Sequence, residues 1–140
     1  MKKMWFFSNH TPLEEQIQEA RSMGYELIHI KTPILQKDTD VDEEWKKLLK
    51  NLDIRPGDAF VIMGDTRWVS YPIMQRTLDL AHFDGYSWRV YFKAKNQDVF
   101  WSEIKLYTTF TQRIVEEQKQ PDGAVIKKSV FKHGGFVEVL

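Results

Sequence analysis

Two short polar segments carry the side chains of this chain that could do chemistry. The first is Ser8-Asn9-His10-Thr11 and the second is Gly64-Asp65-Thr66-Arg67, and each follows an apolar run. Hydroxyl, amide and backbone N–H groups bind phosphate oxygens, and a guanidinium can bind two of them at once. Gly64 would let a ligand approach the backbone closely. Together the two segments predict a site for an anionic ligand such as a nucleotide.

Each segment also has a purely structural interpretation. Thr11 can cap a helix while Asn9 shapes the preceding turn, and Asp65 can cap a helix while Arg67 stays in solvent. Taken alone, either segment is explained equally well as a connector between a strand and a helix. The hypothesis of a binding site therefore depends on both segments lying at the same edge of a sheet.

The four histidines stand at positions 10, 29, 82 and 133, which is too scattered for a dedicated metal site. His10 is best placed for acid–base work and His133 is second. His29 fits a strand position in the core or at an edge, and His82 fits the end of a helix. The chain has no cysteine and no Gly-x-Ser-x-Gly, dinucleotide-binding or Walker-type motif. We therefore expect no metal, no cofactor and no thiol nucleophile.

The apolar run from Ala59 to Met63 is typical of a parallel strand that is buried on both faces. Met4 to Phe7 and Tyr25 to Ile30 are expected to be strands before it, and Trp88 to Phe92 is expected to be a fourth. Open α/β sheets bind their ligands beyond the carboxyl ends of such strands. Both polar segments would then border one crevice.

Three helices are expected between these strands. Thr11, as the cap, and Pro12 start the first helix, which ends at Gly24. The second follows a loop from Gln36 to Asp42, and the third runs from about Ser70 to His82. Residues 1–92 thus form a β-α-β-α-β-α-β core. This order predicts an α/β, Rossmann-like fold with a mostly parallel sheet flanked by helices.

The last third of the chain has a different character. Residues 93–107 are polar around Trp101 and are expected to be an insertion or a short helix. Residues 108–140 are expected to be a terminal β-hairpin, whose strands meet at the turn formed by residues 120–123. Arg113 adds positive charge to this hairpin, as do Lys127, Lys128 and Lys132, and this pattern by itself fits a solvated face.

Composition limits the remaining possibilities. A length of 140 residues indicates one domain, and 20 basic residues balance 20 acidic ones. No net field would therefore attract long nucleic acid or an anionic membrane surface. The apolar residues near the start are too few for a signal peptide or a membrane span, so we expect a cytoplasmic protein.

The tail of the chain resembles the small single-domain proteins of the Csx series from type III CRISPR systems. The resemblance rests on residues 111–117, 121–125, 128–133 and 136, and on weaker matches at 7–10, 13–16, 55–58 and 64–65. Residues 31–42 and 93–107 look like insertions relative to that family, and the part around Trp101 could act as a lid. Val137 stands where the family often has a basic residue.

This resemblance implies a CARF-like Rossmann fold, a homodimer and a cyclic oligoadenylate ligand, most simply cyclic tetra-adenylate. It also implies ring-nuclease activity without a metal, in which a 2′-hydroxyl of the substrate attacks the adjacent phosphate. The expected catalytic residues are His10, Arg67 and Arg113. The expected ligand-binding residues are Ser8, Asn9, Thr11, Gly64, Asp65, Thr66 and His133.

Two other functions are compatible with the same residues. The chain could bind a cyclic oligoadenylate without cutting it, which would sequester or sense the messenger. It could instead be an α/β interaction subunit whose terminal hairpin docks onto a protein. A protein that only binds the messenger would form no linear product, unlike a nuclease. A chain that binds no cyclic nucleotide would favour the interaction subunit.

Overall fold

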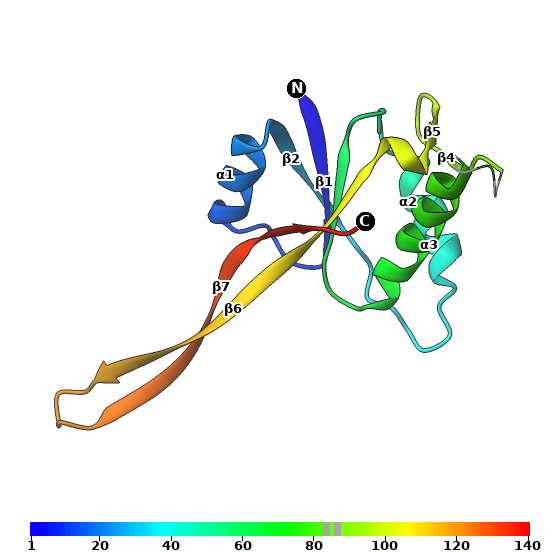
Figure 1. Ribbon diagram of the computed structural model, residues 1–140. Helices are drawn as coiled ribbons and strands as arrows, with labels where there is room; N and C mark the ends of the chain where they lie inside the picture. The colour runs from blue at the N-terminus through cyan, green and yellow to red at the C-terminus, as the bar shows by residue number, and fades with distance from the viewer. Residues whose placement is uncertain (83–84, 86–87) are drawn as a thin grey trace.

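The chain folds around a mostly parallel, five-stranded sheet with helices on both faces (Figure 1). The computed structural model describes residues 1–82, 85 and 88–140. The elements are β1 (Lys2–Ser8), α1 (Glu14–Ser22), β2 (Tyr25–Lys31), α2 (Val41–Leu49), β3 (Ala59–Ile62), α3 (Arg67–Ala81), β4 (Tyr91–Lys93), β5 (Asp98–Phe100), the 3-10 turn η2 (Trp101–Glu103), β6 (Lys105–Lys119) and β7 (Val125–Glu138). The expected α/β class is confirmed.

The strand order of the sheet is β2-β1-β3-β6-β7. The pairs β1–β2, β1–β3 and β3–β6 are parallel, and β7 runs antiparallel to β6. Because β1 lies between β2 and β3, the connections leaving β1 and β3 pass to opposite sides of the sheet. Such a reversal opens a crevice at the carboxyl ends of the two strands.

The alternation of side chains along β1 divides the core into two layers. Met4 and Phe6 pack with Ala20 of α1 on one face. Trp5 and Phe7 point to the opposite face, where they pack with residues of α2 and α3 such as Trp45. Figure 1 shows the same division, with α1 on one side of the sheet and α2 and α3 on the other. Unbroken apolar strands are buried because both faces are covered.

All three helices begin at residues other than those expected, and α2 begins at Val41, inside the loop that was expected to extend to Asp42. α1 begins at Glu14, and the residue that precedes it is Leu13 rather than Thr11, whose capping role was therefore wrong. The backbone N–H of Leu13 is instead satisfied by Oε1 of Gln16 at 2.8 Å. α3 begins at Arg67, three residues before Ser70, because the carboxylate of Asp65 accepts the backbone N–H of Arg67 at 2.9 Å.

The expected fourth parallel strand at residues 88–92 was wrong. Tyr91–Lys93 pairs antiparallel with Asp98–Phe100 in a separate two-stranded sheet, and Trp88 is 91% exposed. The buried carboxylate of Asp79 accepts the backbone N–H of Val90 at 2.9 Å, which holds this segment against α3. β6 takes the fourth parallel position and pairs with β3.

Trp101 belongs to the core rather than to a lid. Its side chain is fully buried, and its ring lies 4.7 Å from that of Phe92 and 5.9 Å from that of Phe60, measured between centroids. Residues 93–107 therefore do not form an insertion over the crevice. They complete the apolar layer beneath α2 and α3 and lead into β6.

Replacing Trp101 with phenylalanine is expected to lower the free energy of unfolding by about 1–2 kcal/mol through lost packing. Nε1 of Trp101 is buried without a hydrogen-bond partner among the described residues, so no such bond is lost. Trp45→Phe should cost about 1–2 kcal/mol more. Nε1 of Trp45 donates to the carbonyl oxygen of Trp68 at 2.9 Å, and Pro72, four residues later, has no N–H to replace it. Urea unfolding of both variants tests this, and equal costs would contradict it.

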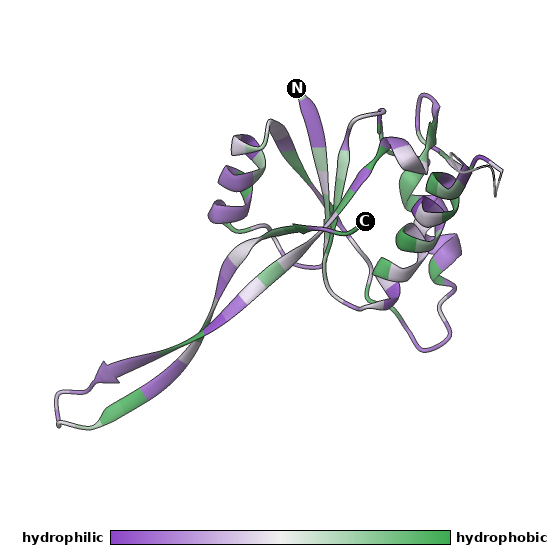
Figure 2. Ribbon diagram, viewed as in Figure 1, coloured by the Kyte–Doolittle hydropathy of each residue, from purple (hydrophilic) through white to green (hydrophobic). Residues whose placement is uncertain are grey.

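The terminal hairpin is confirmed, and most of it extends away from the rest of the molecule. β6 pairs with β3 only through residues 105–107, whereas its pairing with β7 continues to Lys119 and Val125. A register shift between Phe110 and Thr111 marks the place where the two strands leave the sheet. We call residues 111–133 the arm. Figures 1 and 2 show it as a long twisted ribbon that carries both hydrophilic and hydrophobic residues.

Candidate functional site

The loops that leave β1 and β3 lie side by side, as expected. Phe7 pairs with Ile62, and the backbone N–H of Met63 donates to the carbonyl of Phe7 at 3.0 Å. Residues 8–13 and 63–66 therefore start from the same edge of the sheet. Two hollows open there, one on each side of the first loop.

The first hollow, which we call the His133 hollow, has a volume of about 190 Å³. It lies between the β1 loop, α1 and the base of the arm. Its polar lining comes from Ser8, His10, Thr11, Gln16, Thr111, Lys132 and His133. Two histidines and a lysine therefore border one small cavity, although they come from opposite ends of the chain.

The second hollow, which we call the Pro33 hollow, has a volume of about 260 Å³. Asn9, Thr32, Gly64 and Asp65 line it together with an apolar group formed by Pro33, Ile34, Leu35 and Trp68. Ser8, His10 and Met63 line both hollows. The two cavities are thus adjacent and share His10 on their common wall.

Ser8 fixes the shape of the first loop. Its side chain is buried, and its Oγ accepts the backbone N–H of His10 at 2.9 Å. Its carbonyl accepts the N–H of Thr32 at 3.1 Å and lies 3.0 Å from Nε2 of His29. Ser8 therefore positions His10 through the backbone, and His29 braces the same turn. The imidazole of His10 stays exposed between the hollows.

His133 is held by a carboxylate from the other end of the chain. Its Nε2 bonds to Oε2 of Glu19, a residue of α1, and its side chain is only 4% exposed. The backbone N–H of Phe136 donates to both oxygens of Glu19, at 3.1 and 3.2 Å. When the imidazole is neutral, this bond places its proton on Nε2 and leaves a lone pair on Nδ1. Nδ1 is buried and has no hydrogen-bond partner in the described part of the chain.

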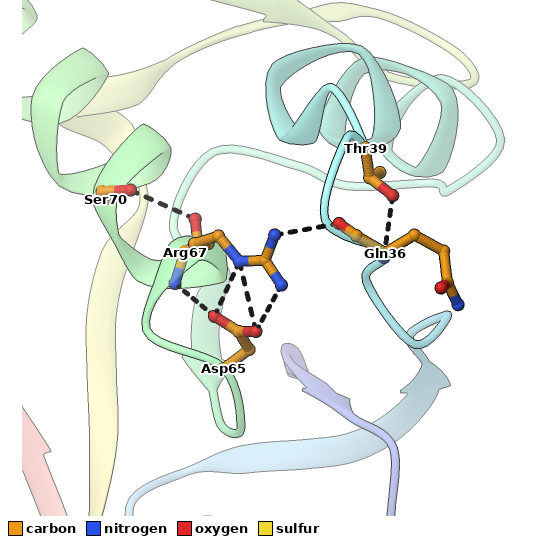
Figure 3. A network of polar contacts seen from close by, with 5 residues as sticks. All are labelled: Gln36, Thr39, Asp65, Arg67 and Ser70. Carbon is orange, nitrogen blue, oxygen red and sulfur yellow. Dashed lines mark hydrogen bonds and ion pairs between the residues drawn. The ribbon is translucent and has the colours of Figure 1, made fainter.

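Arg67 is engaged by protein groups rather than directed into a hollow (Figure 3). Its Nη2 lies 2.8 Å from Oδ2 of Asp65, and its Nη1 donates to the carbonyl of Gln36 at 3.0 Å. The hydrogen bond from Arg67 is the main cause that lowers the pKa of Asp65 from its ordinary value. The pair also offsets the negative charge that Asp65 would present to an anionic ligand in the Pro33 hollow.

The remaining expected site residues are divided between the hollows and other places. Asn9 and Gly64 line the Pro33 hollow, and Gly64 has a φ of +102°, which favours glycine. Thr66 precedes α3 and lines neither hollow. Arg113 lies on the arm, where Nε and Nη2 donate to Oγ of Ser129 at 3.2 and 2.9 Å. Neither expected catalytic arginine therefore borders the cavity that holds His10 and His133.

Two charged residues of the site were not identified from the sequence. Lys132 had been assigned only to the solvated hairpin, although its position next to His133 was a usable signal. Glu19 lies 114 residues from His133, and no local pattern connects them. It is one of several acidic residues in a helix whose first turn is also acidic, and only the tertiary fold distinguishes it.

Two kinds of feature are not found among the described residues. No group of three or more histidine, aspartate or glutamate side chains is placed to hold a metal ion. No helix in residues 1–82, 85 and 88–140 is long and apolar enough to cross a membrane.

Comparison with known proteins matches the chain to a family model. The model of a family described as "Uncharacterized protein MJ1673 family" matches residues 2–137, which is nearly the whole chain. No curated protein and no solved structure matches. The match includes β1, the loop with His10, and the end of the chain with His133.

Proposed function

The chain belongs to the uncharacterized protein MJ1673 family, and we propose that it is a ring nuclease that cuts a cyclic oligoadenylate without a metal ion. The observation that supports this most directly is the pairing of His10 and His133 in one hollow beside Lys132. The resemblance of the tail to the Csx series supports the choice of ligand and a Rossmann-like relation to CARF domains. The reaction would switch off type III CRISPR signalling by removing its messenger.

Attack by a 2′-hydroxyl on the neighbouring phosphorus needs one base and one acid. In the proposed reaction the bound ligand uncovers Nδ1 of His133, and this nitrogen takes the proton of the 2′-hydroxyl as the 2′-oxygen–phosphorus bond forms. The bond from phosphorus to the 5′-oxygen breaks, and His10 protonates that oxygen. The products are a 2′,3′-cyclic phosphate and a free 5′-hydroxyl, so no water is consumed. Each proton transfer contributes about 100- to 10,000-fold in rate.

Glu19 and Lys132 have supporting roles in this proposal. Glu19 holds His133 in the tautomer whose Nδ1 can accept a proton, and it stabilises the imidazolium that results. Lys132 lines the same hollow and would offset the negative charge that builds on the phosphate oxygens. Glu19 acts through His133 and is a positioning residue rather than a catalytic one.

The Pro33 hollow would hold an adenine next to the reacting phosphate. Pro33, Ile34 and Leu35 offer apolar surface for the adenine base, and Ile34 is 73% exposed before any ligand binds. Asn9 and Thr32 line the same hollow and can bond to the edge of a base. His10 on the common wall would then lie between the base and the phosphate. The two hollows together accept only part of the cyclic oligoadenylate, and the rest of that molecule stays outside them.

The test is to incubate the protein with cyclic tri-, tetra- and hexa-adenylate in EDTA and to separate the products. We expect a linear product that ends in a 2′,3′-cyclic phosphate. His10→Ala should lower its rate of formation by about 100-fold or more. His82→Ala, at the end of α3 and outside both hollows, is the matched histidine control and should stay near the wild-type rate.

Two outcomes would contradict the proposal in different ways. Stoichiometric binding of an intact ring, with no product after long incubation, would assign binding alone. If the protein binds no cyclic oligoadenylate, the proposal that its ligand belongs to this class is wrong.

A further inference from the structure

Apart from its base, where His133 bonds to Glu19 of α1, the arm is a two-stranded ribbon that no other part of the described chain supports. Beyond Tyr107 no other strand pairs with the side of β6 that faces β3, and β7 is the last strand of the sheet. Most arm residues are exposed on both faces, among them Val115, Val125 and Ile126, each more than half exposed. Isolated two-stranded hairpins are marginally stable in water. A further strand that pairs along one edge would therefore stabilise a ribbon of this length.

The two edges of the arm differ in charge. β7 carries Lys127, Lys128 and Lys132 and no acidic residue from Val125 to Val137. Lysines are a common means of preventing strand addition at an edge. The β6 edge carries both signs, with Arg113 before Glu116 and Glu117. The β6 edge is therefore the one suited to pairing.

We propose that the arms of two copies of this chain pair antiparallel along their β6 edges, with Val115 facing Val115 of the second copy. A two-fold axis perpendicular to the ribbon requires facing residues to lie on the same face. In this register Arg113 of each copy faces Glu117 of the other. The reason is that the axis passes through Val115, so a residue two positions before Val115 faces the residue two positions after it in the second copy. Both share a face with Val115 because side chains alternate along a strand.

Other symmetric registers give poorer charge pairing. A shift of two residues in one direction places Arg113 opposite Lys119, and a shift of four places two Arg113 side chains or two Glu117 side chains face to face. Opposite charges across strands stabilise a sheet, and like charges destabilise it. The register centred on Val115 forms two Arg–Glu pairs and one apolar contact, and symmetry makes the two ion pairs identical. This inference does not depend on the proposed nuclease activity.

Light scattering of the full chain after size exclusion is the first test, with twice the chain mass of 16.7 kDa expected. Arg113→Glu should weaken the dimer by about tenfold or more, because it creates two Glu–Glu contacts. Arg113→Glu combined with Glu117→Arg should restore the dimer by exchanging the charges. Gln118→Arg, which changes the opposite face of the same strand, is the matched control and should remain dimeric.

Cysteine crosslinking tests the register directly, because the chain has no cysteine of its own. Directly opposed residues of antiparallel strands have Cα atoms about 4.5–5.5 Å apart, which suits a disulfide. Val115→Cys should therefore form a covalent dimer under mild oxidation. Ser129→Cys, which faces Val115 within the same arm, is the control and should crosslink far more slowly.

Three results would overturn the inference. They are a monomeric wild type, a dimer that is indifferent to Arg113→Glu, and crosslinking of Val115→Cys no faster than that of Ser129→Cys. Arm charge reversal need not affect folding of the body, and circular dichroism of each variant checks this. Loss of nuclease activity alone would leave the inference standing, since its measurements are mass and crosslinking.

Discussion

His133→Ala is expected to lower the rate of cyclic tetra-adenylate cleavage by about 100- to 10,000-fold. The physical reason is that Nδ1, which has no partner among the described residues, is the proposed acceptor of the 2′-hydroxyl proton. Ring binding should change far less, because Lys132 and the Pro33 hollow remain. Single-turnover cleavage and equilibrium binding measure the two effects separately.

Because the side chain of His133 is nearly buried, its loss could act through packing against Phe136. Added imidazole separates the two explanations. A small base can enter the space left by alanine and restore part of the rate, whereas it cannot repair a disturbed fold. Rescue that rises with imidazole concentration supports proton transfer. A variant that is fully folded and cleaves at the wild-type rate would exclude His133 from the reaction.

Glu19→Gln distinguishes positioning from catalysis at the same place. Glutamine keeps a carbonyl that can accept from Phe136 or His133, but it removes the charge that stabilises an imidazolium. We expect kcat to fall by about 100- to 10,000-fold with little change in KM. Imidazole should not rescue this variant, because the space for it is still filled.

The strands that form the crevice could be predicted because local pattern and burial agree there. β1 and β3 are apolar without interruption, and such runs occur where helices cover both faces of a sheet. Parallel pairing of these strands then brings the residues after Phe7 and Ile62 to one edge. The edge of the sheet at which the hollows open therefore followed from sequence pattern and the expected topology.

The fourth parallel strand could not be located from pattern, because tertiary contacts decide it. Residues 88–92 have β-prone composition, but the Asp79 carboxylate captures the backbone at Val90. Ile104 and Leu106 instead alternate into the core and lead β6 into the sheet. The sequence does show an aspartate, Asp79, within the apolar pattern of the third helix. Nothing local shows that it is buried or which N–H groups it accepts.

The chemistry of the site was only partly accessible for the same reason. His10 could be placed because it follows a strand directly, whereas the pairing of His133 with Glu19 joins the two ends of the chain. Arg67 was expected to meet a phosphate, and its neighbour Asp65 binds it first. Because Asp65 lies only two residues before Arg67, the guanidinium can bind this carboxylate when no ligand is present.

Replacement of the buried residue Asp79 should strongly destabilise the fold. Its carboxylate is fully buried and accepts from Val90 N at 2.9 Å, Ser102 N at 2.8 Å and Arg89 Nε at 3.0 Å. It therefore ties α3 to the segment before β4 and to η2. Burial would raise the pKa of Asp79, but the hydrogen bonds from Ser102, Arg89 and Val90 outweigh it and lower the pKa to about 2.

Asp79→Asn should therefore lower the free energy of unfolding by about 3 kcal/mol at pH 7. An amide has one accepting oxygen, so at least one buried N–H would face the NH₂ group of the substituted side chain instead of an acceptor. Urea unfolding followed by circular dichroism measures the loss. Asp53→Asn is the matched control, because its partly exposed carboxylate bonds only to Arg55 and Asn96 in the described chain, and it should leave the unfolding curve nearly unchanged.

The pH dependence gives the same prediction a second, independent test. The pKa of Asp79 falls from 3.8 to about 2 on folding, so the folded state favours the charged form. The resulting stability, about 2 kcal/mol, is fully present above pH 4 and is lost as the pH falls toward 2. The difference between wild type and Asp79→Asn should shrink by that amount over this range. A difference that stays constant from pH 6 to pH 2 would show that the charge of Asp79 contributes nothing.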